Sequence, residues 1–369
     1  MKISCSKTNL LNSIQTVSRA VSTKSTMSII ECILIDAGSD EIKLTANNME
    51  LAIETMLDGE TEEPGIVALE AKILQDIIRH LPDDEVTLST DETYLTTIRC
   101  GKAKFNIIGK KGDDFPRLPE VKKDNPFVIS QMTLKDVVRQ TIFSIAENDN
   151  NKVMSGELLE VKNNELKLVS LDGHRISIRK LELKNEHDDI KVIIPGKALN
   201  EVSKIIAGDT EKDIQLFFTD KHVLFEFDQT IIVSRIIEGE YFNINQMLSN
   251  DYETKVDINK KDLLGCIERA TLLVKEGDKK PIIISITDGD MELKINSAIG
   301  SMNENIEIEK EGEDIVIGFN PKFLIDALRV IDDETITLYL VNPKAPCTIK
   351  NVEESYIYLI LPVNFNTVS

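Results

Sequence analysis

One segment of this 369-residue chain occurs three times, at a constant spacing of 125 residues. Its copies begin at Lys72, Lys197 and Lys322. In each copy an acidic residue follows the lysine by four positions, a basic residue follows it by seven, and apolar residues fill the first, second and fifth positions after it. Self-similarity at a fixed spacing is typical of chains built from repeated structural units. The spacing therefore predicts three related modules.

A second helical pattern precedes each copy, in which apolar residues recur at helical spacing. It covers residues 10–20, 134–142 and 263–270. Small polar or acidic residues near the three starts are candidate N-caps: Ser6 or Thr8, Thr133, and Asn259 or Asp262. Alternating apolar and polar residues predict half-buried strands between the two helices, at 42–45, 166–169 and 291–295, and again after each copy, at 86–88, 214–216 and 336–340.

The order of these elements favours an α+β fold made of three repeated modules. Each module would contain antiparallel sheet with two helices on one face, because few helices are long enough to serve as crossovers between parallel strands. We place the modules at residues 1–120, 127–249 and 253–369. The predicted joints are the Phe115-Pro116-Arg117-Leu118-Pro119 segment and the polar stretch Ser249-Asn250-Asp251.

The net charge argues against two classes of binding protein. With 43 basic and 63 acidic residues the net charge is −20, which argues against a generic basic nucleic-acid binder and against a binder of anionic membranes. It does not exclude a protein that confines its positive charge to one surface. No apolar run is long enough to span a membrane, and the first residues lack an apolar signal region. Five scattered cysteines fit a reduced, cytoplasmic protein without disulfides.

Motifs for catalysis or metal binding are weak. The Gly109-Lys110-Lys111-Gly112 segment lacks phosphate-loop spacing, and no cluster of Cys and His has zinc spacing. The nearest candidate is Asp172-Gly173-His174-Arg175, where a hydrolase would use His174 as general base and Asp172 to orient it. Neighbours along a strand point apart, so a turn or a binding role is favoured over catalysis.

The repeated segment places basic residues on one face of a helix. Seven residues are about two helical turns, so each lysine shares a face with the base that follows it: Lys72 with Arg79, Lys197 with Lys204, and Lys322 with Arg329. Taken singly, each helix favours a solvated surface on which Asp76, Glu201 and Asp326 form ordinary ion pairs. The threefold repetition in an acidic chain favours a polyanion held by the helices, through phosphate contacts that are independent of sequence and sensitive to salt.

Five motifs together resemble one family. They are Met1-Lys2-Ile3 leading to Leu10-Leu11, Asp114-Phe115-Pro116-Arg117-Leu118-Pro119, Asp172-Gly173-His174-Arg175, Gly318-Phe319-Asn320-Pro321-Lys322-Phe323-Leu324, and Tyr358-Leu359-Ile360-Leu361-Pro362-Val363. The order of these motifs along the chain, together with the threefold repeat, resembles that of the bacterial DNA polymerase III beta subunits, the sliding clamps. The resemblance implies a clamp fold and a head-to-tail homodimer that forms a six-module ring around double-stranded DNA.

In such a ring the helices line the hole and the sheets form the outside. The resemblance implies no enzymatic activity, no cofactor, and neither catalytic nor metal residues. It implies as partners the DNA polymerase III catalytic subunit, a clamp loader that opens the ring with ATP, and other proteins that carry a clamp-binding motif.

The resemblance also assigns site residues. Lys24 matches a DNA-contacting loop base of the family and Lys197 a hole-facing lysine; the other expected DNA contacts are Lys72, Arg79, Lys204, Lys322 and Arg329. The expected peptide-binding groove comprises Met154, Leu171, Gly173, His174, Arg175, Ile176, Phe242, Met247, Pro346, Leu359, Ile360, Leu361, Pro362 and Val363. The expected dimer contact joins Ile73, Ile77, Phe105 and Ile107 to Leu272 and Leu273 of a second copy, although apolar residues at these positions could equally be core.

The chain departs from the family at several of these positions. Phe242 stands in place of a groove proline, Gln246 in place of a groove base, and Asn364 and Asn151 in place of arginines; Gly196 replaces a base beside Lys197. The departures keep a second hypothesis open, in which a divergent clamp-fold protein binds peptides without encircling DNA.

Overall fold

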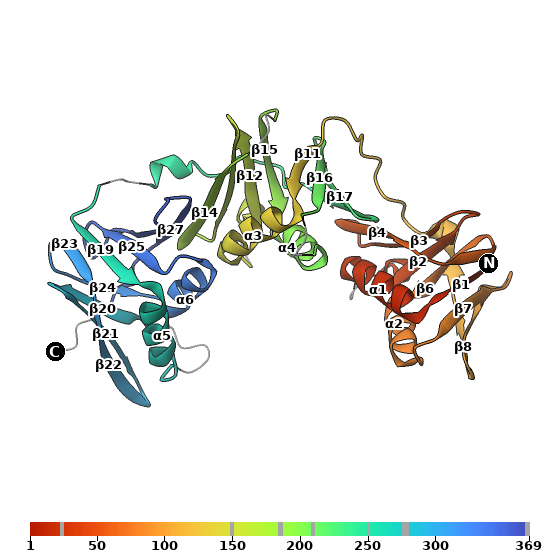
Figure 1. Ribbon diagram of the computed structural model, residues 1–369, viewed down its shortest axis with the longest axis horizontal. Helices are drawn as coiled ribbons and strands as arrows, with labels where there is room; N and C mark the ends of the chain where they lie inside the picture. The colour runs from red at the N-terminus through yellow and green to blue at the C-terminus, as the bar shows by residue number, and fades with distance from the viewer. Residues whose placement is uncertain are drawn as a thin grey trace. The chain divides into compact units, whose positions relative to one another are not determined.

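The computed structural model describes residues 1–22, 26–147, 151–183, 187–207, 211–248, 251–274 and 280–365. Three modules follow one another along the chain, each with two helices, and every strand pair is antiparallel (Figure 1). None of the helices in the described ranges is both long and apolar enough to cross a membrane.

The N-terminal module contains β1 (Lys2–Ser6), α1 (Lys7–Val17), β2 (Cys32–Ala37), β3 (Ile42–Asn47), β4 (Leu51–Leu57), β5 (Glu60–Glu63), β6 (Gly65–Glu70), α2 (Ala71–His80), β7 (Glu85–Thr90), β8 (Leu95–Cys100), β9 (Ala103–Ile108) and β10 (Lys110–Lys111). The central module contains β11 (Phe127–Ser130), α3 (Gln131–Thr141), β12 (Gly156–Lys162), β13 (Glu165–Leu171), β14 (Arg175–Glu182), β15 (Ile190–Pro195), α4 (Gly196–Ile205), β16 (Asp213–Phe218), β17 (His222–Phe227) and β18 (Thr230–Arg235).

The C-terminal module contains β19 (Thr254–Asn259), α5 (Lys260–Thr271), β20 (Ile282–Thr287), β21 (Asp290–Ser297), β22 (Gly300–Glu307), β23 (Glu309–Gly312), β24 (Ile315–Phe319), α6 (Pro321–Val330), β25 (Thr335–Leu340), β26 (Cys347–Lys350) and β27 (Tyr356–Ile360). Every strand and helix predicted from the sequence pattern coincides with one of these elements.

Two of the four antiparallel sheets are shared between modules. Four sheets have the strand orders β5-β1-β7-β8-β9, β10-β6-β2-β3-β4-β18-β17-β16-β11, β15-β12-β13-β14-β27-β26-β25-β19-β23 and β22-β21-β20-β24. Both nine-stranded sheets therefore continue from one module into the next. The chain divides into two compact units along these sheets, Met1–Leu134 with Asn200–Ile236, and Lys135–Leu199 with Ile237–Ser369.

The two module junctions share one register. At the first junction Leu51 of β4 lies opposite Ser234 of β18, and at the second Arg175 of β14 lies opposite Ile360 of β27. The residue after each β18 or β27 partner bonds back to the preceding turn: Arg235 N–H donates to the Glu50 carbonyl at 3.1 Å, and Leu361 N–H donates to the His174 carbonyl at 2.8 Å. Each junction strand thus has an exact counterpart in the other junction.

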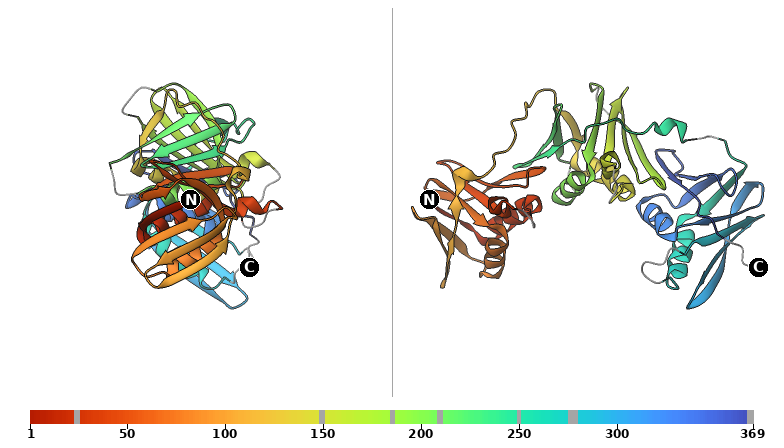
Figure 2. Two further views of the ribbon diagram at one scale, coloured as in Figure 1. Left: turned by 90° about the vertical axis from the view of Figure 1, so that its right-hand side faces the viewer. Right: turned by 180° about the vertical axis from the view of Figure 1, so that it is seen from behind.

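The helices pack between sheets rather than on one outer face. α1 contacts β3 and β4 of one sheet and β1 of the other, and α5 contacts β19, β21 and β22. In the N-terminal module α1 lies beside α2, and in the C-terminal module α5 lies beside α6 (Figure 1 and Figure 2). The C-terminal core is mostly aliphatic, as the low aromatic content predicts, with Phe319, Tyr356 and Tyr358 as its buried aromatic residues.

Side-chain caps begin the first helix of each module. Ser6 accepts from Asn9 N–H at 3.1 Å, and Asn259 accepts from Lys261 N–H at 2.9 Å. The prediction of Thr133 as a cap is wrong: Ser130 accepts from the Thr133 N–H at 3.1 Å, so Thr133 lies inside the first turn. The local pattern of small polar residues allows both positions, and the strand end before the helix decides between them.

Candidate functional site

The repeated basic segments form α2, α4 and α6, which all begin one residue before their lysine. Lys72, Lys197 and Lys322 are exposed in these helices. The expected pairing of each lysine with the acid four residues later is absent among the described contacts. In α2, Asp76 instead lies 3.6 Å from Arg79, the base three residues beyond it.

The acid in α4 also pairs away from the lysine. Glu201 contacts Lys204 at 3.0 Å and Arg19 of η1 (Ser18–Ala20) at 2.8 Å. Partial burial alone would raise the pKa of Glu201, but its bonds to Arg19 and Lys204 hold that pKa below its ordinary value. Two cations therefore keep this carboxylate charged and occupied.

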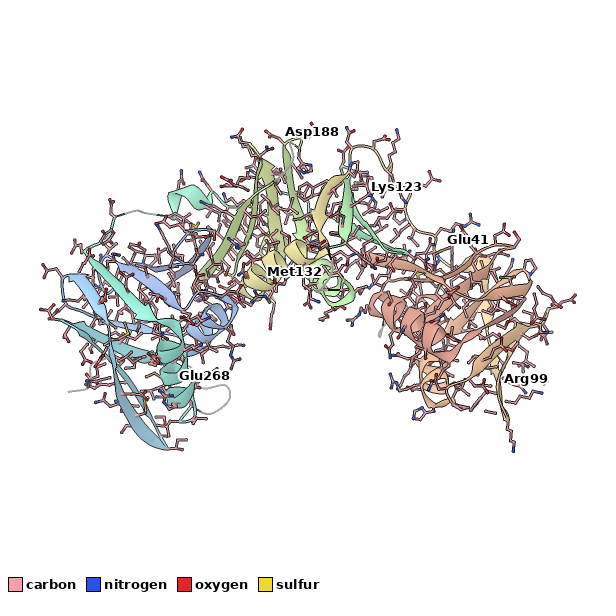
Figure 3. All side chains as sticks on the ribbon, viewed as in Figure 1. Glu41, Arg99, Lys123, Met132, Asp188 and Glu268 are labelled. Carbon is pink, nitrogen blue, oxygen red and sulfur yellow. The ribbon has the colours of Figure 1, made fainter. Side chains whose placement is uncertain are left out.

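In α6 the acid and the base have separate partners. Arg329 pairs with Glu268 of α5 at 2.8 Å (Glu268 is labelled in Figure 3). Asp326 pairs with Arg175 of the central module at 2.7 Å. Across the described residues, Lys72, Lys197 and Lys322 have no ion pair, so each is available to a phosphate. Lys24, the expected loop contact, lies outside the described residues.

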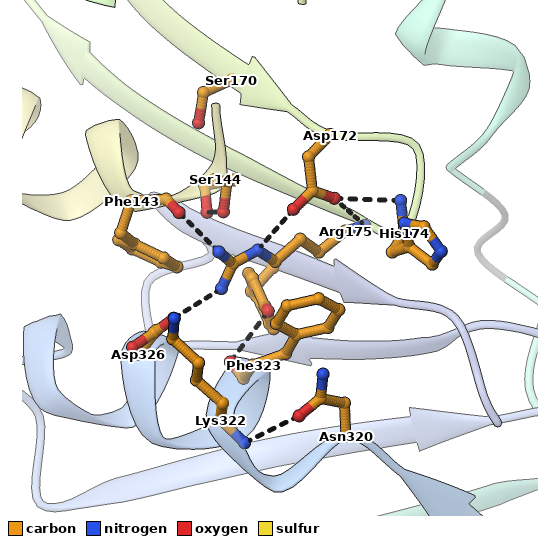
Figure 4. A network of polar contacts seen from close by, with 12 residues as sticks. Phe143, Ser144, Ser170, Asp172, His174, Arg175, Asn320, Lys322, Phe323 and Asp326 are labelled. Atoms are coloured by element: carbon orange, nitrogen blue, oxygen red, sulfur yellow. Dashed lines mark hydrogen bonds and ion pairs between the residues drawn. The ribbon is translucent and has the colours of Figure 1, made fainter. Parts of the chain in front are cut away.

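Arg175 is the centre of a buried polar network (Figure 4). Its residue is 7 % exposed. The guanidinium donates to Asp172 at 3.0 Å, to Asp326 at 2.7 Å and to the Phe143 carbonyl at 2.6 Å. It also lies 4.2 Å from the centre of the Phe323 ring. Each of the three guanidinium nitrogens therefore has a partner, and Arg175 connects the β13–β14 turn to α6.

The hydrolase interpretation finds no support in the geometry of this turn. Asp172 Oδ1 accepts from the backbone N–H groups of His174 and Arg175 at 3.0 and 3.1 Å, and its Oδ2 accepts from Arg175. Gly173 adopts a φ of +83°, which an L side chain rarely adopts, so the turn requires glycine. Asp172 therefore caps a turn and holds an arginine, and the structure gives it no bond to the imidazole.

The expected groove residues divide into a buried floor and an exposed rim. Leu171, Ile176 and Leu359 belong to an apolar cluster at the second junction, against which Met154 and Phe242 pack partly buried. Ile360 points the other way, into the C-terminal core. The rim consists of exposed or half-exposed residues: Gly173, His174, Met247, Pro346, Leu361, Pro362 and Val363.

The expected dimer contacts are three exposed and three half-buried residues, of which Leu273 also packs against the C-terminal core. Ile73 is 43 % exposed, Phe105 is 40 % and Leu272 is 79 %, while Ile77, Ile107 and Leu273 are half-buried. Sequence reasoning missed Ile108, which is 82 % exposed, and Ile299 beside β22. The strand order explains both, because β9 and β22 are edge strands.

Comparisons with known proteins agree with this architecture. Three models of the DNA polymerase III beta subunit match the chain: the N-terminal domain at residues 1–119, the central domain at 128–243 and the C-terminal domain at 245–364. A beta sliding clamp of Staphylococcus epidermidis is 34% identical over 374 residues, covering 98% of this chain and 99% of that protein.

Solved structures are also similar over the whole chain. A putative DNA polymerase III beta subunit from Eubacterium rectale has a TM-score of 0.96 and 64% identity, with 100% of both chains covered. The DNA polymerase sliding clamp from Bacillus subtilis has a TM-score of 0.95 and 32% identity, covering 99% of this chain and 100% of that one. The chain therefore belongs to the bacterial DNA polymerase III beta subunit family, the beta sliding clamps.

Proposed function

We propose that the protein is a DNA sliding clamp, in which two copies close head to tail around duplex DNA. The observation that carries this proposal is the strand order of the four sheets. Two sheets have nine strands and join two modules, whereas the other two have five and four strands. The two shorter sheets end in edge strands β9 and β22. An exposed edge of this kind invites pairing with another chain.

The internal repeat identifies the partner of each edge. β9 occupies the place in its module that β18 and β27 occupy in theirs, and β22 occupies the place of β4 and β14. β4 pairs with β18 and β14 pairs with β27. Pairing β9 with β22 of a second copy repeats the same junction and gives a third kind of nine-stranded sheet. The contact is head to tail, and twofold symmetry closes it into a ring.

The ring would hold DNA by topology rather than by tight binding. The exposed Lys72, Lys197 and Lys322 supply phosphate contacts, and the neighbouring acids keep the positive charge low. Such contacts carry no sequence information, so the clamp can slide. In this proposal the protein catalyses no reaction, and a separate clamp loader opens it with ATP.

The second junction would bind the partners of the clamp. Its buried floor of Leu171, Ile176 and Leu359 and its rim of Met247 and Leu361 suit a short extended peptide with apolar side chains. We propose the DNA polymerase III catalytic subunit, the clamp loader and other proteins with a clamp-binding motif as occupants, and the cytoplasm as their location.

Retention on circular DNA tests the proposal. The protein is loaded onto nicked circular DNA with the clamp loader of the same organism and ATP, separated from free protein, and followed after a restriction enzyme linearises the circle. We expect retention on the circle and loss from the linear product. Equal retention on both forms contradicts encirclement, and no retention on either favours the divergent clamp-fold interaction protein.

A charge-matched control separates the effect of the helix lysines from the effect of the total charge of the protein. The combined variant Lys72→Glu, Lys197→Glu, Lys322→Glu should lose retention on the circle. The combined variant Lys122→Glu, Lys162→Glu, Lys191→Glu changes the charge equally at exposed positions outside the module helices and should retain it. Equal behaviour of the two variants would remove the role proposed for the basic helices.

A further inference from the structure

The C-terminal strap, residues 361–365, crosses the rim of the second junction. Leu361 N–H donates to the His174 carbonyl at 2.8 Å, and Val363 N–H donates to the Gly318 carbonyl of β24 at 2.8 Å. Between these two bonds the side chains of Leu361 and Val363 remain exposed, at 39 and 38 %. The strap thus joins the β13–β14 turn of the central module to the outer face of the C-terminal module.

Gly318 is the point at which the strap lies closest to the sheet. A Cβ built on Gly318 would lie 2.5 Å from Phe365 Cδ1 and 3.0 Å from the Val363 carbonyl oxygen. Real Cβ atoms do not approach a carbon at 2.5 Å, so any larger residue must displace the Phe365 ring. The lack of a side chain at position 318 therefore leaves the space that the Phe365 ring occupies.

The first junction contains a similar strap, in which the large and the small residue have exchanged positions in the sequence. There Ile237 N–H donates to the Ile193 carbonyl at 2.8 Å, which is the counterpart of the bond at Gly318. The strand position that holds Gly318 at the second junction holds Ile193 at the first. Two residues along the strap, Phe365 is replaced by Gly239. The exchange of sizes is one of sequence alone: a Cβ on Gly239 would meet Val153 Cγ2 at 3.1 Å, so the contact between strand and strap at Gly318 and Phe365 is a feature of the second junction.

We propose that Gly318 and Phe365 form a size-matched pair that positions the C-terminal strap as one wall of the peptide groove. Gly318 is a positioning residue: it touches no partner, and it acts by letting Phe365 hold Leu361 and Val363 in place. This inference rests on the proposed groove function and adds to it the element that fixes the shape of the groove. The strap lacks regular strand pairing along its length, so its two backbone bonds and this ring contact hold it.

A tryptophan reporter tests the contact without any partner. The chain has no tryptophan, so Phe365→Trp introduces a single fluorophore at the strap. In this background Gly318→Ala should shift the emission to longer wavelength and raise its quenching by iodide, because the ring leaves its seat. An unchanged spectrum and unchanged quenching would overturn the proposal.

Affinity for the DNA polymerase III catalytic subunit of the same organism tests the consequence. Gly318→Ala and Phe365→Ala should each weaken binding about tenfold, the scale of one buried apolar contact, while the dimer mass and the melting temperature change little. The double variant Gly318→Ala with Phe365→Ala should bind about as weakly as either single variant, because both changes break the same contact.

The outcomes separate this inference from the proposed function. If the wild-type protein does not bind the polymerase subunit, the proposed groove function fails. If it binds and neither single variant weakens it, or if the two losses of affinity add up in the double variant, the size-matched pair is refuted. Should Gly318→Ala misfold, Phe365→Ala leaves β24 untouched and gives the same test.

Discussion

Glu157 gives the fold a dependence on pH that can be worked out from its surroundings. This residue of β12 is 0 % exposed, and neither carboxyl oxygen has a hydrogen-bond partner in the described part of the chain. The nearby Thr141 hydroxyl donates to the Val137 carbonyl at 2.8 Å. Burial raises the pKa of Glu157 well above its ordinary value, and Thr141 offsets only part of that effect. The folded protein therefore keeps this carboxyl group protonated to a higher pH than an exposed glutamate.

The direction of the effect follows from the raised pKa. Below the ordinary glutamate pKa of about 4.3 both the folded and the unfolded chain are protonated at this site, and Glu157 costs nothing through ionisation. Above it the unfolded chain releases a proton that the folded chain keeps. Stability then falls by about 1.4 kcal/mol for each pH unit until the pH reaches the raised folded pKa.

Comparison of Glu157→Gln with the wild-type protein measures this term. The amide keeps the shape of the carboxyl group and does not titrate, so its stability relative to wild type should rise between pH 5 and 8 with a slope of up to about 1.4 kcal/mol per pH unit. Urea unfolding followed by circular dichroism at several pH values gives the slope. The buffers must hold ionic strength constant.

Glu160→Gln is the matched control. Glu160 lies on the same strand but is half-exposed and pairs with Lys167 at 3.5 Å. The stability of this variant relative to wild type should not rise with pH. A difference between Glu157→Gln and wild type that stays constant from pH 5 to 8 would refute the reasoning, because it would mean that Glu157 ionises alike in the folded and unfolded chains.

Three further predictions concern the candidate site and its framework. Asp326→Asn removes one charged partner of the buried Arg175 and should cost about 2 kcal/mol in urea unfolding; a loss under about 0.5 kcal/mol, the scale of a neutral surface change, would contradict the network. Leu272→Asp should convert the dimer to monomer in light scattering, whereas Val352→Asp, at an equally exposed residue outside the predicted contact, should not; a dimeric Leu272→Asp would exclude this contact. Asn259→Ala should destabilise the start of α5 by about 1 kcal/mol, and unchanged unfolding would show that the cap is dispensable.

Elements with a local pattern were predictable from sequence. The repeated apolar positions correctly predicted α2, α4 and α6, because a buried helical face needs apolar residues at helical spacing. Ion-pair partners were less predictable. The acid of each repeat is four residues after one base and three before another, and both spacings allow contact on a helix. In α2 the structure has the second pairing, Asp76 with Arg79.

Strand order could not be predicted from the sequence pattern. Alternation tells which face of a strand is buried, but not which strand lies beside it. β4 and β18 are separated by about half of the first module and most of the second, yet they are neighbours in one sheet. The edge residue Ile108 was missed for the same reason, since only the strand order makes β9 an edge.

Arg175 is a position at which the two module junctions differ. In the shared register its counterpart at the first junction is Leu51, which is 3 % exposed, so the fold can fill this position with an aliphatic side chain. A buried ion pair generally adds little stability over such a side chain. Arg175 instead orients the turn relative to α6, because Asp172 in the turn and Asp326 on α6 each accept a hydrogen bond from a different guanidinium nitrogen. The arginine thus fixes the angle between the β13–β14 turn and α6, the helix that carries Lys322. This is the junction at which a peptide is expected to bind.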